Sequence, residues 1–242
     1  MLWQKSRRRS ARSGGRKRRS ICLGNSLVLF DIDGTLVRRA GPHHRMALVE
    51  AIRQVTGVET STEGIPVHGM LDPDILTLML QAAGLGTEQL PQIIEAAQDI
   101  YEASVPDLRD KTCPGVPALL EELRSRGVVL ALVTGNLTRI GWRKLERAGI
   151  RDYFLYGAFS ETATTRGGLA KLAIERARRE GLIEGTSPIC LVGDAPQDII
   201  AAKENGIRSI GVRTGITPAG ELEVCCPDHL LDDLTQFDLS II

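Results

Sequence analysis

Short apolar runs alternate with helical patterns along most of the chain, and this alternation restricts the fold more than any other feature. From residue 26 onward, apolar β-rich runs predict strands at Leu27–Ile32, Val128–Thr134, Ile189–Gly193 and Ser209–Val212, with a weaker candidate at Tyr153–Phe159. The runs are nearly continuous in apolar residues, as strands buried on both faces of a parallel sheet require. The predicted fold class is therefore α/β.

Helical patterns lie between these strands and also fill a long gap after the first one. The helices between strands are expected at Val116–Arg126, Thr138–Ala148, Leu169–Glu180 and Gln197–Asn205, and most of them end near a glycine: Gly127, Gly149, Gly181 and Gly206. The gap has helical spacing at Met46–Thr56, Pro73–Ala83 and Glu88–Tyr101 and no strand pattern. An insertion there would overhang the C-terminal edge of the first strand, where open α/β sheets bind ligands. We therefore expect residues 38–112 to form a helical cap on a core of residues 23–37 and 113–242.

The N-terminal segment has an unusual charge. Residues 1–20 hold seven Arg, two Lys and no acid, although the formal net charge of the whole chain is zero. Without these nine, 21 of the 30 basic residues remain against 30 acidic ones, and a folded body of that sign gives no support for a nucleic-acid-binding face. Residues 1–22 lack apolar periodicity and are predicted to be a disordered basic tail. Transit peptides and nucleic-acid patches have a similar composition, so both stay open.

Cysteine usage and hydropathy indicate the compartment. The five cysteines are an odd number without C-x-x-C spacing, so free cytosolic thiols are expected rather than a zinc site or a redox pair. No apolar run approaches the roughly 20 residues of a membrane span, and no secretory signal is predicted. We expect a cytoplasmic protein without a membrane partner, and the sequence does not indicate its oligomeric state.

The first motif that indicates chemistry is Asp31-Ile32-Asp33-Gly34-Thr35, which directly follows the first predicted strand. Two carboxylates two residues apart on an extended chain point the same way. An EF-hand loop would need Gly and Glu where the chain has Leu36 and Pro42. A solvated turn would not explain two acids at the end of a buried strand. Asp31 and Asp33 are therefore candidates for catalysis.

Two further strand ends carry polar residues. Thr134-Gly135-Asn136 precedes a helix, where a hydroxyl, backbone N–H groups and a helix N-terminus make an anion site, although an ordinary strand-to-helix turn has the same composition. Asp194 ends a third strand, and Asp198 follows it in the first turn of a helix, where acids are common. Acids and a hydroxyl from three strand ends would form a pocket for phosphate and a divalent cation, because hard oxygen ligands suit Mg²⁺.

Taken in order, these segments resemble the signatures of the haloacid dehalogenase-like superfamily, and within it the phosphoglycolate phosphatase-like branch with a helical cap. The resemblance runs from about Leu27 to the end of the chain and implies a Rossmann-like core with the cap inserted after the first strand. Within this superfamily the dehalogenases lack an acid at the position of Asp33, so the resemblance indicates phosphate chemistry. Gly69-Met70-Leu71-Asp72-Pro73 looks like the G-x-T-D-P stretch of helical caps, with Leu71 in place of the usual Thr.

The resemblance also implies a mechanism, that of a Mg²⁺-dependent phosphomonoesterase acting on a small phosphorylated metabolite. Asp31 would form an aspartyl phosphate, and Asp33 would act as general acid and then general base. Thr134, Gly135 and Asn136 would hold the phosphoryl oxygens. The implied Mg²⁺ ligands are three carboxylates and one backbone carbonyl: Asp31, Asp194, Asp198 acting through water, and the carbonyl group of Asp33.

Several assignments rest on position alone. Arg166, just before a predicted helix, is preferred over Lys171 as the basic residue of the family signature, although either could be a solvated helix charge. His68 and Asp72 in the cap are candidates for contact with the substrate. Two alternative functions stay open: a sugar phosphomutase of the same superfamily, and a protein that uses the basic tail to bind nucleic acid or another acidic partner.

Overall fold

The computed structural model describes residues 26–218 and 220–242, so the predicted disordered tail, residues 1–22, lies outside the described residues. Six strands form one sheet: β1 (Leu27–Phe30), β2 (Val129–Val133), β3 (Tyr156–Ala158), β4 (Ile189–Gly193), β5 (Arg208–Val212) and β6 (His229–Leu231). Their order is β3-β2-β1-β4-β5-β6, and every neighbouring pair is parallel. The predicted α/β class with a Rossmann-like parallel sheet is confirmed.

The strands follow the sequence pattern with one exception. All five predicted strands are present, each within a few residues of its expected ends. The prediction missed β6, a strand of three half-buried residues at the edge of the sheet. Such a short strand has too few residues to show either alternation or an apolar run.

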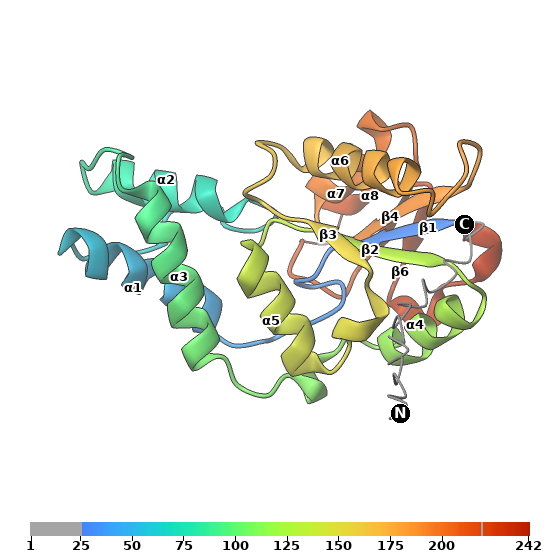
Figure 1. The fold of residues 1–242 in the computed structure, drawn as a ribbon, viewed down its shortest axis with the longest axis horizontal. Helices are drawn as coiled ribbons and strands as arrows, with labels where there is room; N and C mark the ends of the chain where they lie inside the picture. The colour runs from blue at the N-terminus through green and yellow to red at the C-terminus, as the bar shows by residue number, and fades with distance from the viewer. Residues whose placement is uncertain (1–25, 219) are drawn as a thin grey trace, which may run out of the picture.

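Helices cover both faces of the sheet (Figure 1). On one face lie α4 (Val116–Ser125) and α5 (Thr138–Ala148), and on the other lie α6 (Arg166–Arg179) and α7 (Pro196–Glu204). The side chains of β1 alternate between the two: Val28 and Phe30 join the core cluster that contains α4 and α5, whereas Leu27 and Leu29 join the cluster of α6 and α7. The removal of each such apolar side chain from water stabilises the fold by about 1.5–3 kcal/mol.

The remaining helical elements of the core are short. Helix α8 spans Glu221–Val224, and single 3₁₀ turns occur at Arg109–Lys111, Arg151–Tyr153, Leu234–Gln236 and Leu239–Ile241. The four glycines predicted to end helices have φ between 62° and 74°, which is the left-handed conformation of a helix C-terminus.

Three helices are inserted between β1 and α4: α1 (His43–Thr56), α2 (Asp72–Ala82) and α3 (Leu90–Ser104). Figure 1 shows them as a separate group at the left, beside the body that contains the sheet. Apolar residues on α1 and α3, among them Leu48, Ile52 and Ile93, are fully buried and belong to the same cluster as Val28 and Phe30. The inserted helical cap is therefore present, and its exact limits, 38 and 112, stay a prediction.

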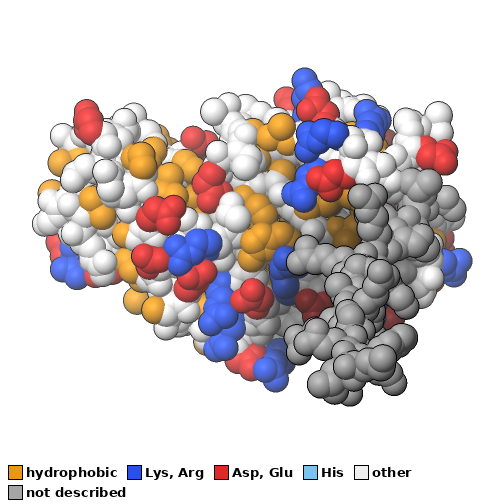
Figure 2. All heavy atoms as spheres, viewed as in Figure 1, with side chains coloured by type: hydrophobic (Ala, Val, Ile, Leu, Met, Phe, Trp, Pro, Cys, Tyr) orange, Lys and Arg blue, Asp and Glu red, His pale blue; other side chains and the backbone are white. Residues whose placement is uncertain are grey.

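Charged side chains link the cap to the core at the surface. Arg139 on α5 pairs with three acids of α3: its guanidinium lies 2.7 Å from Asp99 and 3.5 Å from Glu95, and it also bonds Glu102. On the face shown in Figure 2, acidic and basic side chains are intermingled rather than gathered by sign.

Among the helices of the described residues, none combines the length and the apolar character that crossing a membrane would require.

Candidate active site

The carboxyl ends of three neighbouring strands meet at one edge of the sheet. In the register of β1 with its neighbours, Phe30 lies beside Leu132 of β2 and Val192 of β4. The residues just beyond these strands therefore come together, because parallel strands end at the same edge. This brings Asp31, Thr134 and Asp194 close together, as the sequence predicted.

Three carboxylates form a compact group at this edge. Asp31, Asp194 and Asp198 each offer an oxygen atom, and these atoms all lie within 4.8 Å of one another. All three residues are buried, with Asp198 at the first turn of α7. Gly34 makes room for the group, since a Cβ atom there would lie 2.3 Å from Asp194 Oδ2. The Asp33 side chain is not part of this group.

Burial and mutual repulsion disfavour the ionised forms of these three carboxyl groups when no metal ion is bound. Burial, followed by the charges of Asp31 and Asp198, raises the pKa of Asp194 to about 9. Burial also raises the pKa of Asp198 to about 7, although Arg166 opposes the shift. The pKa of Asp31 is likewise raised by burial, against the opposing effect of Arg166. Buried carboxylates with raised pKa values are typical of functional sites.

Arg166 is the cation that the structure places among these acids. It begins α6, is buried, and donates from Nη1 to Asp31 Oδ1 at 2.9 Å and to Val133 O at 3.2 Å. Its Nε atom lies 3.4 Å from Asp198 Oδ1. Lys171, the alternative considered from the sequence, is exposed one turn further along α6 and lies 4.0 Å from Glu175. Arg166 reaches the site and Lys171 does not.

The donor set fits a small divalent cation. Asp194 Oδ2 and Asp198 Oδ1 are buried and have no hydrogen-bond partner among the described residues. Buried carboxylate oxygens are normally paired, so two unpaired ones facing the same group indicate room for a positively charged ligand. Hard oxygen donors of this kind suit Mg²⁺. Asp31, Asp194 and Asp198 could therefore hold such an ion.

Asp33 lies beside this group and has a different set of partners. Its two carboxylate oxygens accept hydrogen bonds from the Lys144 ammonium at 2.7 and 2.6 Å, and Oδ2 also accepts one from Asn136 Nδ2 at 2.8 Å. Burial by itself would raise the pKa of Asp33, but the Lys144 ammonium and the hydrogen bond from Asn136 outweigh it and lower that pKa below its ordinary value. Asp33 is thus held by a cation and an amide, whereas the metal-site acids repel one another.

Lys144 is a site residue that the sequence patterns did not predict. It is 1% exposed and lies on the buried face of α5, four residues from both Ile140 and Ala148. A signal was present in the sequence, because this lysine occupies a position where the helical spacing calls for an apolar side chain. An isolated lysine on a helix is nevertheless usually solvated.

The loop after β2 provides polar groups close to Asp31 and Asp33. Thr134 is fully buried, and its hydroxyl oxygen accepts a hydrogen bond from Asn136 Nδ2 at 2.7 Å. Gly135 and Asn136 line the cavity described below. The role of these residues as phosphoryl ligands stays a prediction.

A cavity of about 490 Å³ opens above the strand ends, between the core and the cap. Its lining includes Asp31, Asp33 and Arg166 from the core, together with His68 and Asp72 from the segment that the sequence assigned to the cap. This volume is typical of sites for small molecules. The structure therefore brings the predicted core and cap residues together around one cavity.

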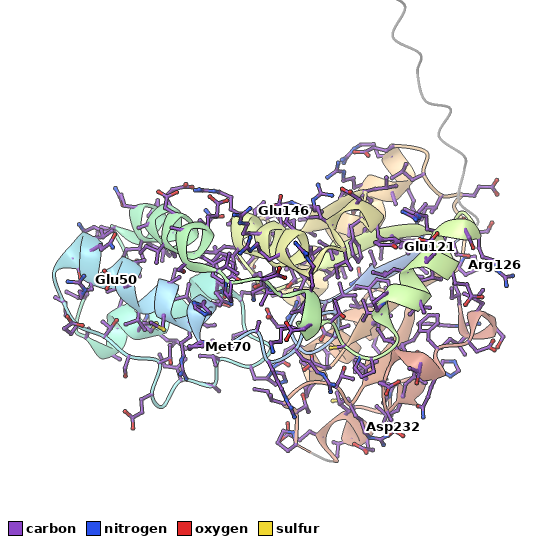
Figure 3. The ribbon with its side chains drawn as sticks, turned by 90° about the horizontal axis from the view of Figure 1, so that it is seen from below. Glu50, Met70, Glu121, Arg126, Glu146 and Asp232 are labelled. Atoms are coloured by element: carbon purple, nitrogen blue, oxygen red, sulfur yellow. The ribbon has the colours of Figure 1, made fainter. Side chains whose placement is uncertain are left out.

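The segment before α2 joins the cap to the core by close backbone contacts. Asp72 N donates to Gly135 O at 2.8 Å, and Leu137 N donates to Asp72 Oδ2 at 2.8 Å. A Cβ atom on Gly135 would lie 2.2 Å from Met70 O, so only glycine allows this approach. Figure 3 labels Met70 where the cap meets the body of the sheet.

The two cap residues predicted to contact substrate have partners in the structure. The buried Asp72 carboxylate lies 2.9 Å from His44 Nε2 in addition to its bond with Leu137. His68 Nε2 lies 2.6 Å from Thr217 Oγ1 and 3.7 Å from Asp194 Oδ2. Burial lowers the pKa of His68, although Asp31 opposes the shift. His68 thus stands next to the carboxylate group, and Asp72 helps to dock the cap.

Comparisons with known proteins agree with this geometry. The sequence model of a family described as haloacid dehalogenase-like hydrolase matches residues 26–206. The phosphoglycolate phosphatase of Synechococcus elongatus is 28% identical over 217 residues, which cover 86% of this chain and 95% of that protein.

Two solved structures share the fold. CbbY from Rhodobacter sphaeroides, solved in complex with phosphate, has a TM-score of 0.68 and 20% identity, with coverage of 89% of this chain and 98% of CbbY. A beta-phosphoglucomutase from Clostridium difficile has a TM-score of 0.67 and 19% identity, with coverage of 89% and 94%. At these identities, the likeness concerns the fold alone.

Proposed function

The chain belongs to the haloacid dehalogenase-like hydrolases, in the phosphoglycolate phosphatase-like branch, and is a hydrolase of the phosphatase type; on this premise we propose that it cleaves a small phosphate monoester with the help of Mg²⁺. The observation that carries the proposal is the buried group of Asp31, Asp194 and Asp198 beside Arg166, at one end of a cavity between the core and the cap.

Asp31 is the proposed nucleophile. Arg166 donates to its Oδ1 atom and so orients the carboxylate, which leaves Oδ2 as the atom to attack phosphorus. Attack would form an aspartyl phosphate and split one difficult displacement into two easier steps. Arg166 would also stabilise the negative charge on the phosphoryl oxygens.

The proposed metal ligands are Asp31, Asp194, Asp198 and the backbone carbonyl of Asp33. Asp194 and Asp198 each have a buried oxygen without a hydrogen bond and a raised pKa, and both observations support this assignment. Mg²⁺ bound there would offset the charge of the carboxylates and of the phosphate.

The remaining roles fall to residues at the ends of β1 and β2. Asp33 would give a proton to the leaving oxygen and later take one from the hydrolytic water. Thr134 and the backbone amides of Gly135 and Asn136 would hold the phosphoryl oxygens. The Asn136 side chain is bonded to Asp33 and Lys144, whereas its backbone N–H makes only a long hydrogen bond of 3.4 Å to Thr134 Oγ1, so the backbone N–H is the Asn136 donor that could turn to the substrate.

The cavity also supports a substrate with a second anionic group. Arg39 and Arg45 line it and form no ion pair with any residue that the structure describes. Free guanidinium groups at a small cavity favour a carboxylate or a further phosphate. Phosphoglycolate, named for the Synechococcus relative, carries a carboxylate. We therefore propose a small, doubly anionic phosphate ester as the substrate class.

A screen tests this proposal. Purified protein is incubated with phosphoglycolate, sugar phosphates, nucleotides and a folded phosphoprotein, each with and without Mg²⁺, and released phosphate is measured. We expect Mg²⁺-dependent release from small anionic esters and little from the phosphoprotein, which is too large to enter a cavity of about 490 Å³ under the cap. Isomer exchange without phosphate release would indicate the mutase alternative, and no release from any ester would refute the proposal.

A further inference from the structure

Lys144 uses every proton of its ammonium group within the site. Besides Asp33, its Nζ atom lies 2.6 Å from Asn136 Oδ1 and 3.0 Å from His44 Nδ1. An ammonium group has three protons and no acceptor, and Asp33, Asn136 and His44 take one each. Lys144 is therefore fixed from three directions, one of which comes from helix α1 of the cap.

The proton count also fixes the state of His44. Since Lys144 can only donate, His44 Nδ1 accepts, and the ring proton lies on Nε2. That proton points to Asp72 Oδ2 at 2.9 Å. A chain of hydrogen bonds thus runs from Asp72 through His44 and Lys144 to Asp33.

A purely structural role does not account for this arrangement. Moving a charged lysine into the interior is unfavourable before it is paired, whereas an apolar side chain would fill the same face of α5 without that cost. Its partner is not a core residue, because the Asp33 side chain is 47% exposed and lines the cavity. The buried cation thus holds a carboxylate that faces the substrate space.

We propose that Lys144 is a positioning residue that holds the Asp33 carboxylate ready to take a proton from the hydrolytic water, an inference that rests on the phosphatase function proposed above. Both oxygens of Asp33 share one ammonium proton of Lys144, and Oδ2 also accepts a hydrogen bond from Asn136, which is the bonding of an oriented carboxylate. In this step the water oxygen bonds to phosphorus, the bond between phosphorus and Asp31 breaks, and the proton of the water passes to Asp33. Lys144 itself exchanges no proton.

The test removes the ammonium group and resolves the two steps of the reaction. In Lys144→Met, kcat should fall about 10²-fold, as expected when proton transfer is impaired. The ratio kcat/KM, which reports formation of the aspartyl phosphate, should fall less, because that step uses the protonated form of Asp33, which the neighbouring ammonium group disfavours. Acid-quenched samples should therefore contain more phosphorylated enzyme than the wild type. Lys171→Met, which removes an exposed lysine from α6, is the matched control and should behave as wild type.

Either of two kinetic results would overturn the inference: an unchanged kcat, or an equal fall of kcat and kcat/KM without accumulation of phosphorylated enzyme. If the methionine variant does not fold, Lys144→Gln, which keeps a donor without the charge, should show the same accumulation to a smaller extent. A crystal structure of the variant gives a readout independent of turnover, in which the Asp33 carboxylate should leave Asn136. An unmoved carboxylate would contradict the inference, whereas a wild type that releases no phosphate from any ester would refute only the proposed function.

Discussion

Asp31 and Arg166 are 135 residues apart in the sequence, and they form a buried ion pair of 2.9 Å at the end of β1. The same guanidinium lies 3.4 Å from Asp198, so one cation serves two carboxylates from different elements. Asp194, the third acid of the group, has no Lys or Arg partner within the described part of the chain. The site therefore has more buried negative than positive charge, and this excess underlies the first three predictions.

Replacing the nucleophile should separate chemistry from stability. Asp31→Asn is expected to lower kcat to less than about a hundredth of the wild-type value, because an amide does not attack phosphorus. The melting temperature without Mg²⁺ should stay within about 4 °C of wild type, since the change removes a charge that burial disfavours. Phosphate release and thermal unfolding measure the two effects. Activity above that limit would mean that another group is the nucleophile.

The two basic residues on α6 should differ sharply. Arg166→Lys is expected to lower kcat/KM by about 10²–10³-fold, because a lysine loses the planar fork that reaches both Asp31 and Asp198. Lys171→Met, at an exposed position, should leave kcat/KM within about twofold of wild type. Steady-state kinetics on one substrate compare the pair. A larger loss from Lys171→Met would reverse the assignment of the basic residue.

Stabilisation by Mg²⁺ should increase with pH. The folded protein without metal holds protons on Asp194 and Asp198, whose pKa values are raised to about 9 and about 7 by burial, whereas the unfolded chain releases them near 3.8. Because the folded state binds more protons in this window, these two groups make the metal-free fold less stable as pH rises. Mg²⁺ binds the ionised carboxylates and competes with protons for them. The stabilisation that bound Mg²⁺ adds to the fold therefore increases as pH rises.

The gain in melting temperature on adding MgCl₂ should therefore be larger at about pH 8 than at about pH 6. Thermal unfolding at the two pH values measures it. Asp194→Asn, which removes one proposed ligand, is the control and should lose most of the gain. A gain that is equal at both pH values, or larger at the lower one, would contradict the proposed metal site.

The sequence predicted the part of the site that local pattern determines. An acid at the end of an apolar run marks a strand end at the ligand-binding edge, and this rule located Asp31, Asp33 and Asp194 correctly. Arg166 was preferred for its position before a helix, and its contacts with Asp31 and Asp198 agree with that choice.

Local sequence patterns do not predict contacts between segments that are far apart in the chain. Lys144 lies 111 residues from Asp33, and whether such a lysine is solvated or buried depends on how α5 packs on the sheet. The close approach of Gly135 to Met70 depends on the path of the cap backbone. The edge strand β6 is too short to produce a pattern. In each case the deciding interaction is tertiary.

The last prediction concerns cap closure and uses the contact between Gly135 and Met70. In Gly135→Ala, the new methyl group would lie 2.2 Å from Met70 O, so the cap must move away from the core. That movement would weaken the hydrogen bond from Asp72 N to Gly135 O and open the cavity to water. We expect kcat/KM for the best small ester to fall at least about 10-fold, since small displacements of positioning groups have large kinetic effects. Activity on a folded phosphoprotein, relative to the small ester, should rise. Gly185→Ala is the matched control, because a Cβ atom there meets nothing within 4 Å. An unchanged kcat/KM in Gly135→Ala, with the same substrate preference, would show that the cap does not complete the site.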